Sequence, residues 1–538
     1  MKKKLIHSKD WGVYLVASIA VVAVLVADGW SYNHNLIVGY GDSASHLVIS
    51  RRVIDNLTPG LGQLGSSWLP ALHVLMLPFI WNDFLWHTGL AGTIVSNLAY
   101  IGAAIYGYRL VRMFIDSKSW ALAVVISLFA NPNLLYMSTT AMNEALYVFS
   151  VLGSTVHLLK WSRKPKQYLH LLIAALLAFL TAFNRYEGWF LVIGQAVVVY
   201  AVGWKQLGKR YGFAGAIVFA YIAWLAPVLW LGWNLLIFSD PLEFLHNEYT
   251  SRAQQSELEA LGQLPTKGNI LVAAQYYYAA MTNVLGRIST ISLLMLVVLS
   301  PLLVVLLRRR FQKEDSYSDL LIGYALLIPG IFLVYTLFSG VTALHLPDLV
   351  PFRMYNIRYA LFVFPALVFF AAYGIHLAYK IWRPLAVVCT LIIILGMTLT
   401  WTIPALVLEE GKENARSRTQ SILAAAALRS QYDGGKILLD SRAPLLEAAG
   451  VGAGNTIMWQ SQLPLKSFIH EGTQEIWERA LANPASEAHW MILRNSPGVI
   501  ESNDTVAAKV LDSEQILSQY DLAYKDGALE IYRLKKSY

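Results

Sequence analysis

Long apolar runs separated by short polar segments fill the first 400 residues of the chain. A helix of roughly 20 residues crosses about 30 Å of hydrocarbon, and in lipid every backbone polar group has to be paired within the protein. Runs of this kind therefore predict eleven membrane-spanning helices, near residues 11–30, 86–113, 120–137, 143–161, 168–183, 188–204, 212–237, 289–307, 319–339, 359–380 and 384–404.

Two apolar segments allow other interpretations. The opening "MKKK" and its apolar run resemble a cleavable secretory signal, but about 17 apolar residues exceed the usual signal core, which favours a retained anchor. The segment 66–81 is short and contains Pro70 and Pro78, both costly inside a helix. We expect it to lie at the membrane interface without crossing.

The placement of basic residues tests this count, because short cytoplasmic loops collect Lys and Arg. With eleven spans all basic clusters fall on one side, namely "MKKK", Arg109/Arg112/Lys118, "KWSRKPK", "KQLGKR", "RRRFQK" and Lys380/Arg383. Counting 66–81 as a span would scatter them over both faces. The topology predicts a multi-pass plasma-membrane protein with a cytoplasmic N-terminus and external segments at 31–85, 239–288, 340–358 and beyond 405.

The composition changes near residue 405, from membrane-like to that of a soluble α/β domain. In the last part of the chain "KILLD", "HWMILR" and "YDLAYKDGALEIYRL" are typical of strands, the last with a turn at Asp526–Gly527, and "TQEIWERALA" and "DSEQILSQY" are typical of helices. We therefore predict two units: 1–405, a membrane domain with the three external loops, and 406–538, an external accessory domain.

Composition agrees with a membrane protein: 56% of the residues are hydrophobic, 14% are charged, and the mean hydropathy is +0.48. The net charge of +8 follows from the topology and from contact with lipid headgroups, so it does not indicate nucleic acid. The single cysteine, Cys389, lies in a predicted span and excludes an intramolecular disulfide.

Acidic and basic side chains gather at the predicted external boundary of the membrane. Asp42 follows the first span, Glu144 opens the fourth, and Arg185 and Glu187 link the fifth and sixth. Charges at this depth usually face a cavity or a partner. Two simpler roles stay open: Asp42 as the N-cap of a helix, and Arg185 with Glu187 as a pair that only satisfies itself.

Taken in order, these motifs resemble the GT-C class of polytopic glycosyltransferases, which includes protein O-mannosyltransferases (dolichyl/polyprenyl-phosphate-mannose transferases) and the aminoarabinose transferase of lipid A. The resemblance covers about residues 10–405 and rests on "YGDSASH", "WLPALHVLMLP", "MNEALYVF", "NRYEGW" and "NIRYALFVFPAL". A lone Asp42 stands where many members have paired acids. The C-terminal part carries no family signature.

The resemblance implies transfer of a sugar, with inversion, from a polyprenyl-phosphate donor to an acceptor hydroxyl outside the cell. The acceptor has to lose a proton, so Asp42 is the expected general base, with Glu144 as a second catalytic carboxylate. The phosphate leaving group needs cations, for which Arg358 and Arg353 are the first candidates and Arg185 and Lys267 the next. Interface snorkelling of the first two arginines is the alternative.

The remaining expectations concern the shape of the site. Tyr276 and Tyr277 would stack on a sugar or else belong to the aromatic belt of the interface, and Glu187 would shape the site. A divalent metal is possible because Asp42, His46, His73 and Glu144 are ligand types, with His46 as a polar partner of Asp42 the alternative.

Two other classes of function stay open. A transporter would use intramembrane acids as an ion path, but the sequence has no inverted repeat and its acids gather at one surface. A non-catalytic assembly subunit would keep the fold without the activity. The expected partners are membrane lipid, the lipid-linked sugar donor, and a glycan, lipid or protein acceptor.

Overall fold

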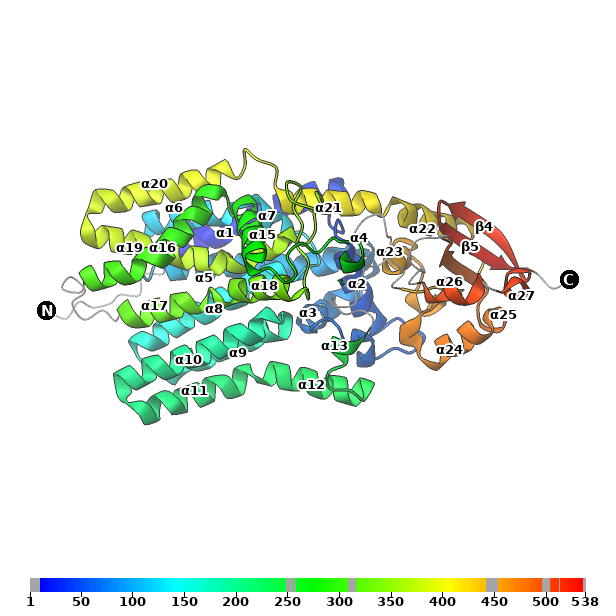
Figure 1. The fold of residues 1–538 in the computed structure, drawn as a ribbon, viewed down its shortest axis with the longest axis horizontal. Helices are drawn as coiled ribbons and strands as arrows, with labels where there is room; N and C mark the ends of the chain where they lie inside the picture. Colours follow the sequence, from blue (N-terminus) through cyan, green and yellow to red (C-terminus); the bar gives the residue numbers. More distant parts are fainter. Residues whose placement is uncertain are drawn as a thin grey trace.

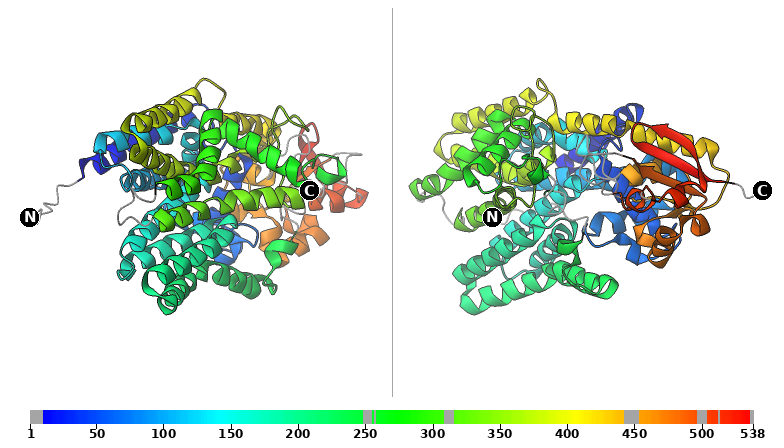
Figure 2. Two further views of the ribbon diagram at one scale, coloured as in Figure 1. Left: turned by 60° about the vertical axis from the view of Figure 1, so that its left-hand side comes forward. Right: turned by 45° about the vertical axis from the view of Figure 1, so that its right-hand side comes forward.

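The computed structural model describes residues 10–247, 255, 258–307, 316–441, 453–495, 504–511 and 513–535. Figure 1 shows a bundle of roughly parallel helices with a small sheet at one end. The views in Figure 2 show the sheet packed on a group of short helices that separates it from the bundle. The predicted class, a helical membrane protein with a small α/β part, is confirmed.

Seven helices of the described residues are long and apolar enough to cross a membrane: Trp11–Asn33, Leu90–Val111, Glu187–Leu207, Lys209–Phe238, Arg287–Leu306, Tyr317–Ser339 and Ile357–Ile381. Three apolar helices are shorter: Ala71–Ile80, Tyr168–Asn184 and Arg383–Leu399. The multi-pass character is therefore confirmed, whereas the number eleven stays a prediction.

The predicted span at 120–137 is bent. Helix α6 (Lys118–Phe129) and helix α7 (Pro132–Ser138) meet at 73°. The break has a local cause, since the Asn131 side chain accepts a hydrogen bond from the Leu134 amide and so caps α7, whose first residue is proline. A segment predicted as one span therefore forms two helices, with the bend at Asn131 and Pro132.

The bundle consists mainly of the following helices: α1 (Trp11–Asn33), α5 (Leu90–Val111), α8 (Glu144–Arg163), α9 (Tyr168–Asn184), α10 (Glu187–Leu207), α11 (Lys209–Ala223), α12 (Leu225–Phe238), α16 (Arg287–Leu306), α17 (Ser316–Ala325), α18 (Ile328–Ser339), α19 (Phe364–Ile381) and α20 (Arg383–Leu399). α8 lies between α5 and α9 and is buried along nearly its whole length. Protein surrounds it, which is why it tolerates more polar side chains than a lipid-facing helix does.

Short helices cover the end of the bundle nearer the sheet: α2 (Gly41–Arg52), η1 (Leu61–Leu64), α3 (Ala71–Ile80), α4 (Asp83–Thr88), α13 (Glu243–His246), α15 (Ile270–Val284), η3 (Ile357–Val363), α21 (Leu406–Ser417) and α22 (Thr419–Gln431). α3 contains Pro78 and has 10 residues. It is too short to span the hydrocarbon, which is consistent with the interfacial position expected for 66–81.

The sheet has five strands in the order β2-β1-β3-β5-β4: β1 (Ile437–Leu438), β2 (Phe468–Ile469), β3 (Trp490–Arg494), β4 (Tyr520–Asp526) and β5 (Leu529–Leu534). β1 pairs in parallel with β2 and β3, whereas β5 is antiparallel to β3 and β4. The surrounding short helices are α23 (Ala453–Gln460), η4 (Leu465–Ser467), η5 (Glu471–Thr473), α24 (Glu475–Ala482), α25 (Pro484–Glu487), α26 (Thr505–Val510) and α27 (Glu514–Leu517).

Within this part, the hairpin turns at Gly527, as predicted, and this residue has the positive φ of 56° that glycine adopts without strain. The helix predicted over "DSEQILSQY" is wrong at its end. Only the single turn Glu514–Leu517 is helical among its described residues, and Tyr520 belongs to β4, where it pairs with Leu534. Strand pairing outweighs local helix propensity there.

The sheet unit is attached to the polar segment that follows α1. The Asp55 carboxylate accepts hydrogen bonds from the backbone amides of Leu465 and Lys466, each at 3.1 Å. The Trp459 indole N–H donates to the Trp86 carbonyl at 2.9 Å. Because the same segment contains Asp42, the unit is fixed to the element that carries the first candidate site residue.

Candidate functional site

Arg358 lies at the centre of a buried group of carboxylates. Its guanidinium is 2.6 Å from Asp42, 3.3 Å from Glu144 and 3.8 Å from Glu410. The guanidinium carbon also lies 4.7 Å from the centre of the Tyr40 ring. We call Asp42, Glu144, Arg358 and Glu410 the carboxylate cluster. Three of its members, Asp42, Glu144 and Arg358, were candidates from the sequence, and the fold brings them together although the first and the last are 316 residues apart.

Local backbone structure aims these side chains at one another. Asn356 has a positive φ of 57°, which asparagine tolerates, and its turn leads directly into η3, on which Arg358 lies. Glu144 is the first residue of α8 and Asp42 lies in the first turn of α2. The N-cap alternative for Asp42 is wrong, because Tyr40 occupies that position and no side chain caps the helix.

Burial distinguishes the two predicted acids. The Asp42 side chain keeps 21% of its surface exposed, whereas the Glu144 side chain has none. Both Glu144 oxygens lack a hydrogen-bond partner in the part of the chain that the structure describes, although Arg358 lies within ion-pair distance. Of these two carboxylates, therefore, Asp42 is the one that a bound molecule reaches without a rearrangement of the protein.

Glu410 is a member that the sequence did not reveal. Its carboxylate accepts hydrogen bonds from the backbone amides of Asn356, at 2.7 Å, and Ile357, at 3.1 Å, and lies 3.0 Å from the Tyr40 hydroxyl. It therefore joins the turn before Arg358 to the residue before α2. Burial raises the pKa of Glu410 to about 6, against the opposing effects of Arg358 and these hydrogen bonds.

The sequence contained no signal for this role. Glu410 stands in the polar stretch "EEGKENARSR", which is typical of the start of a soluble domain, and nothing in its neighbours distinguishes it from Glu409. In the structure Glu410 is buried, whereas Glu409 keeps 35% of its side chain exposed and pairs with Lys412. Only the helical phase of α21 against the bundle separates the two.

Arg185 and Glu187 form a second ion pair beside the cluster, at 3.0 Å. The Arg185 guanidinium stacks over the rings of Phe362 and Tyr359, and Arg358 also lies over the Tyr359 ring, at 5.3 Å. Arg185 and Glu187 thus neutralise each other, as the simpler of the two sequence interpretations held. The pair also lies next to the cluster, because Arg185 and Arg358 share the Tyr359 ring.

His46 lies one helical turn after Asp42 on α2 but does not bind it. Its Nδ1 lies 2.8 Å from Nε2 of His73, and its ring contacts Trp68. Burial, with the charges of Arg358 and Arg185 as smaller causes, lowers the pKa of His46 to about 3. Burial also lowers the pKa of His73, so both imidazoles are neutral at physiological pH. The hydrogen bond of His46 goes to His73, so the hypothesis that His46 is a polar partner of Asp42 is wrong.

The other predicted residues lie elsewhere. Arg353 donates to His345 at 3.1 Å, and Lys267 pairs with Glu259 at 2.5 Å. Tyr276 donates its hydroxyl hydrogen to the Val350 carbonyl, and Tyr277 is buried beside it on α15. The aromatic-belt alternative is wrong for both tyrosines, because their rings are inside the protein. Snorkelling is likewise excluded for Arg358, which is 5% exposed.

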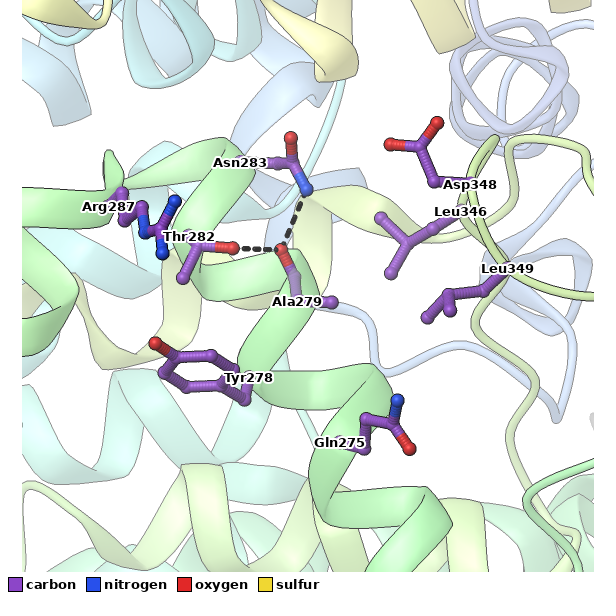
Figure 3. A pocket seen from close by; sticks show the side chains of 9 residues that line it. All are labelled: Gln275, Tyr278, Ala279, Thr282, Asn283, Arg287, Leu346, Asp348 and Leu349. Atoms are coloured by element: carbon purple, nitrogen blue, oxygen red, sulfur yellow. Dashed lines mark hydrogen bonds between the residues drawn. The ribbon is translucent and has the colours of Figure 1, made fainter.

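No three His, Cys, Asp or Glu side chains of the described residues are arranged to hold a metal ion. A pocket of about 400 Å³ lies away from the carboxylate cluster, against α15, the start of α16 and the loop at 346–349 (Figure 3). Two polar residues that line it, Thr282 and Asn283, donate hydrogen bonds to the Ala279 carbonyl. The charged residues of its lining are Arg287 and Asp348.

Two solved structures have a similar fold. Both are ArnT from Cupriavidus metallidurans, one bound to undecaprenyl phosphate with a TM-score of 0.54 and one in the apo state with a TM-score of 0.56. Each match covers 97% of both chains at 12% sequence identity. No protein-family model matches the sequence, and neither does a curated protein. The likeness shows that the chain shares the fold of these two ArnT structures.

Proposed function

We propose that this protein is a glycosyltransferase that transfers a sugar, with inversion, from a polyprenyl-phosphate-linked donor to an acceptor hydroxyl on the external side of the membrane. One observation carries the proposal. On a GT-C fold, Asp42 is a partly exposed carboxylate that is held at 2.6 Å by a buried arginine. Such an acid is fixed in direction and still accessible, as a general base has to be.

The chemistry balances with one base and one leaving group. The acceptor oxygen attacks the anomeric carbon of the sugar and forms the new glycosidic bond, and its proton passes to Asp42. The bond from the anomeric carbon to the phosphate oxygen breaks, and its electron pair leaves on the lipid phosphate. That phosphate is already a weak base, so it needs cations and no proton.

Cations near the cluster support this assignment to different degrees. Arg358 is surrounded by three carboxylates, so an incoming phosphate has to share it with them or displace one of them. Arg185 lies next to it. Arg353 and Lys267 form other contacts and would have to move to reach the same phosphate. The structure with undecaprenyl phosphate belongs to an ArnT, which supports a polyprenyl-phosphate partner here by analogy of fold.

The direct test is incubation of the purified protein with radiolabelled polyprenyl-phosphate sugars and a membrane extract, followed by measurement of label in lipid, glycan and protein fractions. Label in one fraction, lost when Asp42 is replaced, would establish the activity and the acceptor class. If every donor is bound without transfer, the protein is an assembly subunit of the same fold. If no donor is bound, the proposal is wrong.

A prediction concerns Glu410. Glutamine at this position has one acceptor oxygen in place of two and no charge, so at least one of the contacts to Asn356, Ile357 and Tyr40 is lost. A charge-assisted hydrogen bond contributes about 1.5–3 kcal/mol, and we expect kcat to fall roughly ten- to hundredfold in Glu410→Gln with a nearly unchanged KM for the donor. Steady-state kinetics measure both constants.

The matched control is Glu409→Gln, which removes an exposed carboxylate from the same helix and should leave the rate unchanged. The pH profile adds a second readout. As the pH falls through about 6, Glu410 takes up a proton and the native rate should decline. This component should be missing in Glu410→Gln. Equal profiles for the native protein and the variant would show that Glu410 does not position the site.

A further inference from the structure

Basic side chains without acidic partners gather at the end of the bundle away from the sheet. α8 begins at Glu144 in the carboxylate cluster and runs for 20 residues, so its end lies about 30 Å from the cluster. Arg109 from the last turn of α5, His157, Lys160 and Lys164 at the end of α8, and His170 at the start of α9 lie together there. We call these five residues the basic notch.

Contacts between the three helices define this notch. His157 and His170 bring their Nδ1 atoms to 3.1 Å, which ties α8 to α9. The Arg109 guanidinium lies over the Tyr106 ring at 5.6 Å, and the same ring packs edge-on against His157 at 6.0 Å. The charges of Lys160 and Arg109 both act on the His157 ring. Three permanent cations therefore surround a pair of imidazoles.

Three basic residues near the notch have acidic partners, whereas the notch residues have none among the described residues. Arg112 and Lys118 share Asp10, and Arg163 lies 3.9 Å from Asp319. Within the part of the chain that the structure describes, no ion pair joins Arg109, Lys160 or Lys164 to a carboxylate. Lys160 is also half-buried, and a half-buried cation without a partner is costly. The cations of the notch would therefore be stabilised by a bound anion.

Apolar side chains continue from the notch along the membrane-facing side of α9. Leu169, Leu172 and Leu176 are 65%, 37% and 57% exposed and follow one another at helical spacing next to His170. Toward the middle of the bundle Tyr106 of α5 and Leu177 of α9 both pack against Gly153, where a β-carbon would lie 2.8 Å from Leu177 and 2.9 Å from Tyr106. Chains attached to an anion in the notch would lie outside, against the leucines.

We propose that the basic notch is a binding site for the phosphate of an anionic phospholipid, whose acyl chains lie along the exposed leucines of α9. Basic pockets at the ends of transmembrane helices bind such headgroups. A soluble phosphate would neutralise the basic side chains but would make no apolar contact with the leucines of α9, and we therefore propose a lipid as the ligand. The site lies at the opposite end of α8 from the carboxylate cluster and does not depend on the proposed transfer reaction.

The test compares lipid retention by the full-length protein in a neutral detergent. Native mass spectrometry would follow the binding of phosphatidylglycerol, phosphatidylcholine and inorganic phosphate to the native protein, to Arg109→Gln/Lys160→Gln, and to the control Lys209→Gln/Arg210→Gln. The control removes the same charge from two exposed residues at the start of α11. Each lost charge-assisted contact corresponds to about a tenfold weaker affinity.

We expect phosphatidylglycerol to bind the notch variant about tenfold or more weakly, the control to match the native protein, and phosphatidylcholine to be insensitive to both. Should Arg109→Gln/Lys160→Gln not fold, Arg109→Gln alone removes an exposed side chain and should still weaken binding severalfold. Equal retention by the notch variant and the control would overturn the proposal. So would inorganic phosphate that displaces the lipid at comparable concentration, since that outcome would show a site for a soluble anion.

Discussion

Replacement of Asp42 by asparagine is expected to lower turnover by about 10²–10⁴ and to leave donor binding nearly intact. The amide keeps the shape of the side chain and one oxygen toward Arg358, 2.6 Å away in the native protein, but it no longer takes a proton from the acceptor. Transfer from the labelled donor measures turnover, and retention of the donor in a transfer-free assay measures binding.

Asp83→Asn is the matched control, because Asp83 lies in the same polar segment and pairs with an arginine, Arg51, but keeps 71% of its side chain exposed. It should transfer at the native rate. Each variant is assayed with and without a chelator. Loss of native activity on chelation, reversed by added divalent ion, would assign Asp42 to a metal, whereas near-normal transfer by Asp42→Asn would end the case for it as the base.

Removal of Arg358 is expected to have the second large effect, and it has two components. In Arg358→Ala the carboxylates of Asp42, Glu144 and Glu410 lose their shared cation, and breaking a buried ion pair in this way costs about 3–5 kcal/mol of stability. The donor phosphate also loses a charged contact, so its affinity should fall by one to two decades. Thermal unfolding in detergent and donor binding separate the two components.

The controls follow from the same contacts. Arg353→Ala removes an arginine that donates to His345 and touches no member of the cluster, so its unfolding midpoint should change little. If it nonetheless weakens donor binding, Arg353 reaches the phosphate as the sequence predicts. In Arg358→Ala, a second change of Glu410 to glutamine removes one of the unpaired charges and should recover part of the stability. No recovery would show that the three acids are not coupled through Arg358.

The sequence predicted the features that follow from the order of the apolar runs and from the positions of charged residues between them. Hydropathy predicted a multi-pass helical protein, and the positions of Asp42, Glu144 and Arg358 relative to the apolar runs pointed to one end of the bundle. It did not predict what depends on packing. The pairing of Arg358 with three acids needs helical phases that no single run reveals, and the sequence does not show that α8, predicted as a span, is enclosed between α5 and α9.

Errors in the prediction share this origin. The hydrogen bond of His46 goes to His73, which lies on another helix 27 residues later, and not to Asp42 on its own helix. Tyr276 and Tyr277 have the composition of an aromatic belt, yet α15 turns both inward. In each case a local pattern was interpreted within one helix, while a neighbouring element decides where the side chain points.

Glu410 also has a consequence for how the protein is made. The chain is synthesised from its N-terminus, so Asp42, Glu144 and Arg358 enter the membrane before the residue that ties their turns together exists. A nascent chain synthesised only as far as residue 358 contains the arginine and two of the acids, but not Glu410, whose carboxylate accepts hydrogen bonds from the amides of Asn356 and Ile357. For the same reason, a cut at the predicted boundary of 405/406 would separate Glu410 from Asn356 and Ile357, to which it is hydrogen-bonded. The two pieces would then have to be produced together.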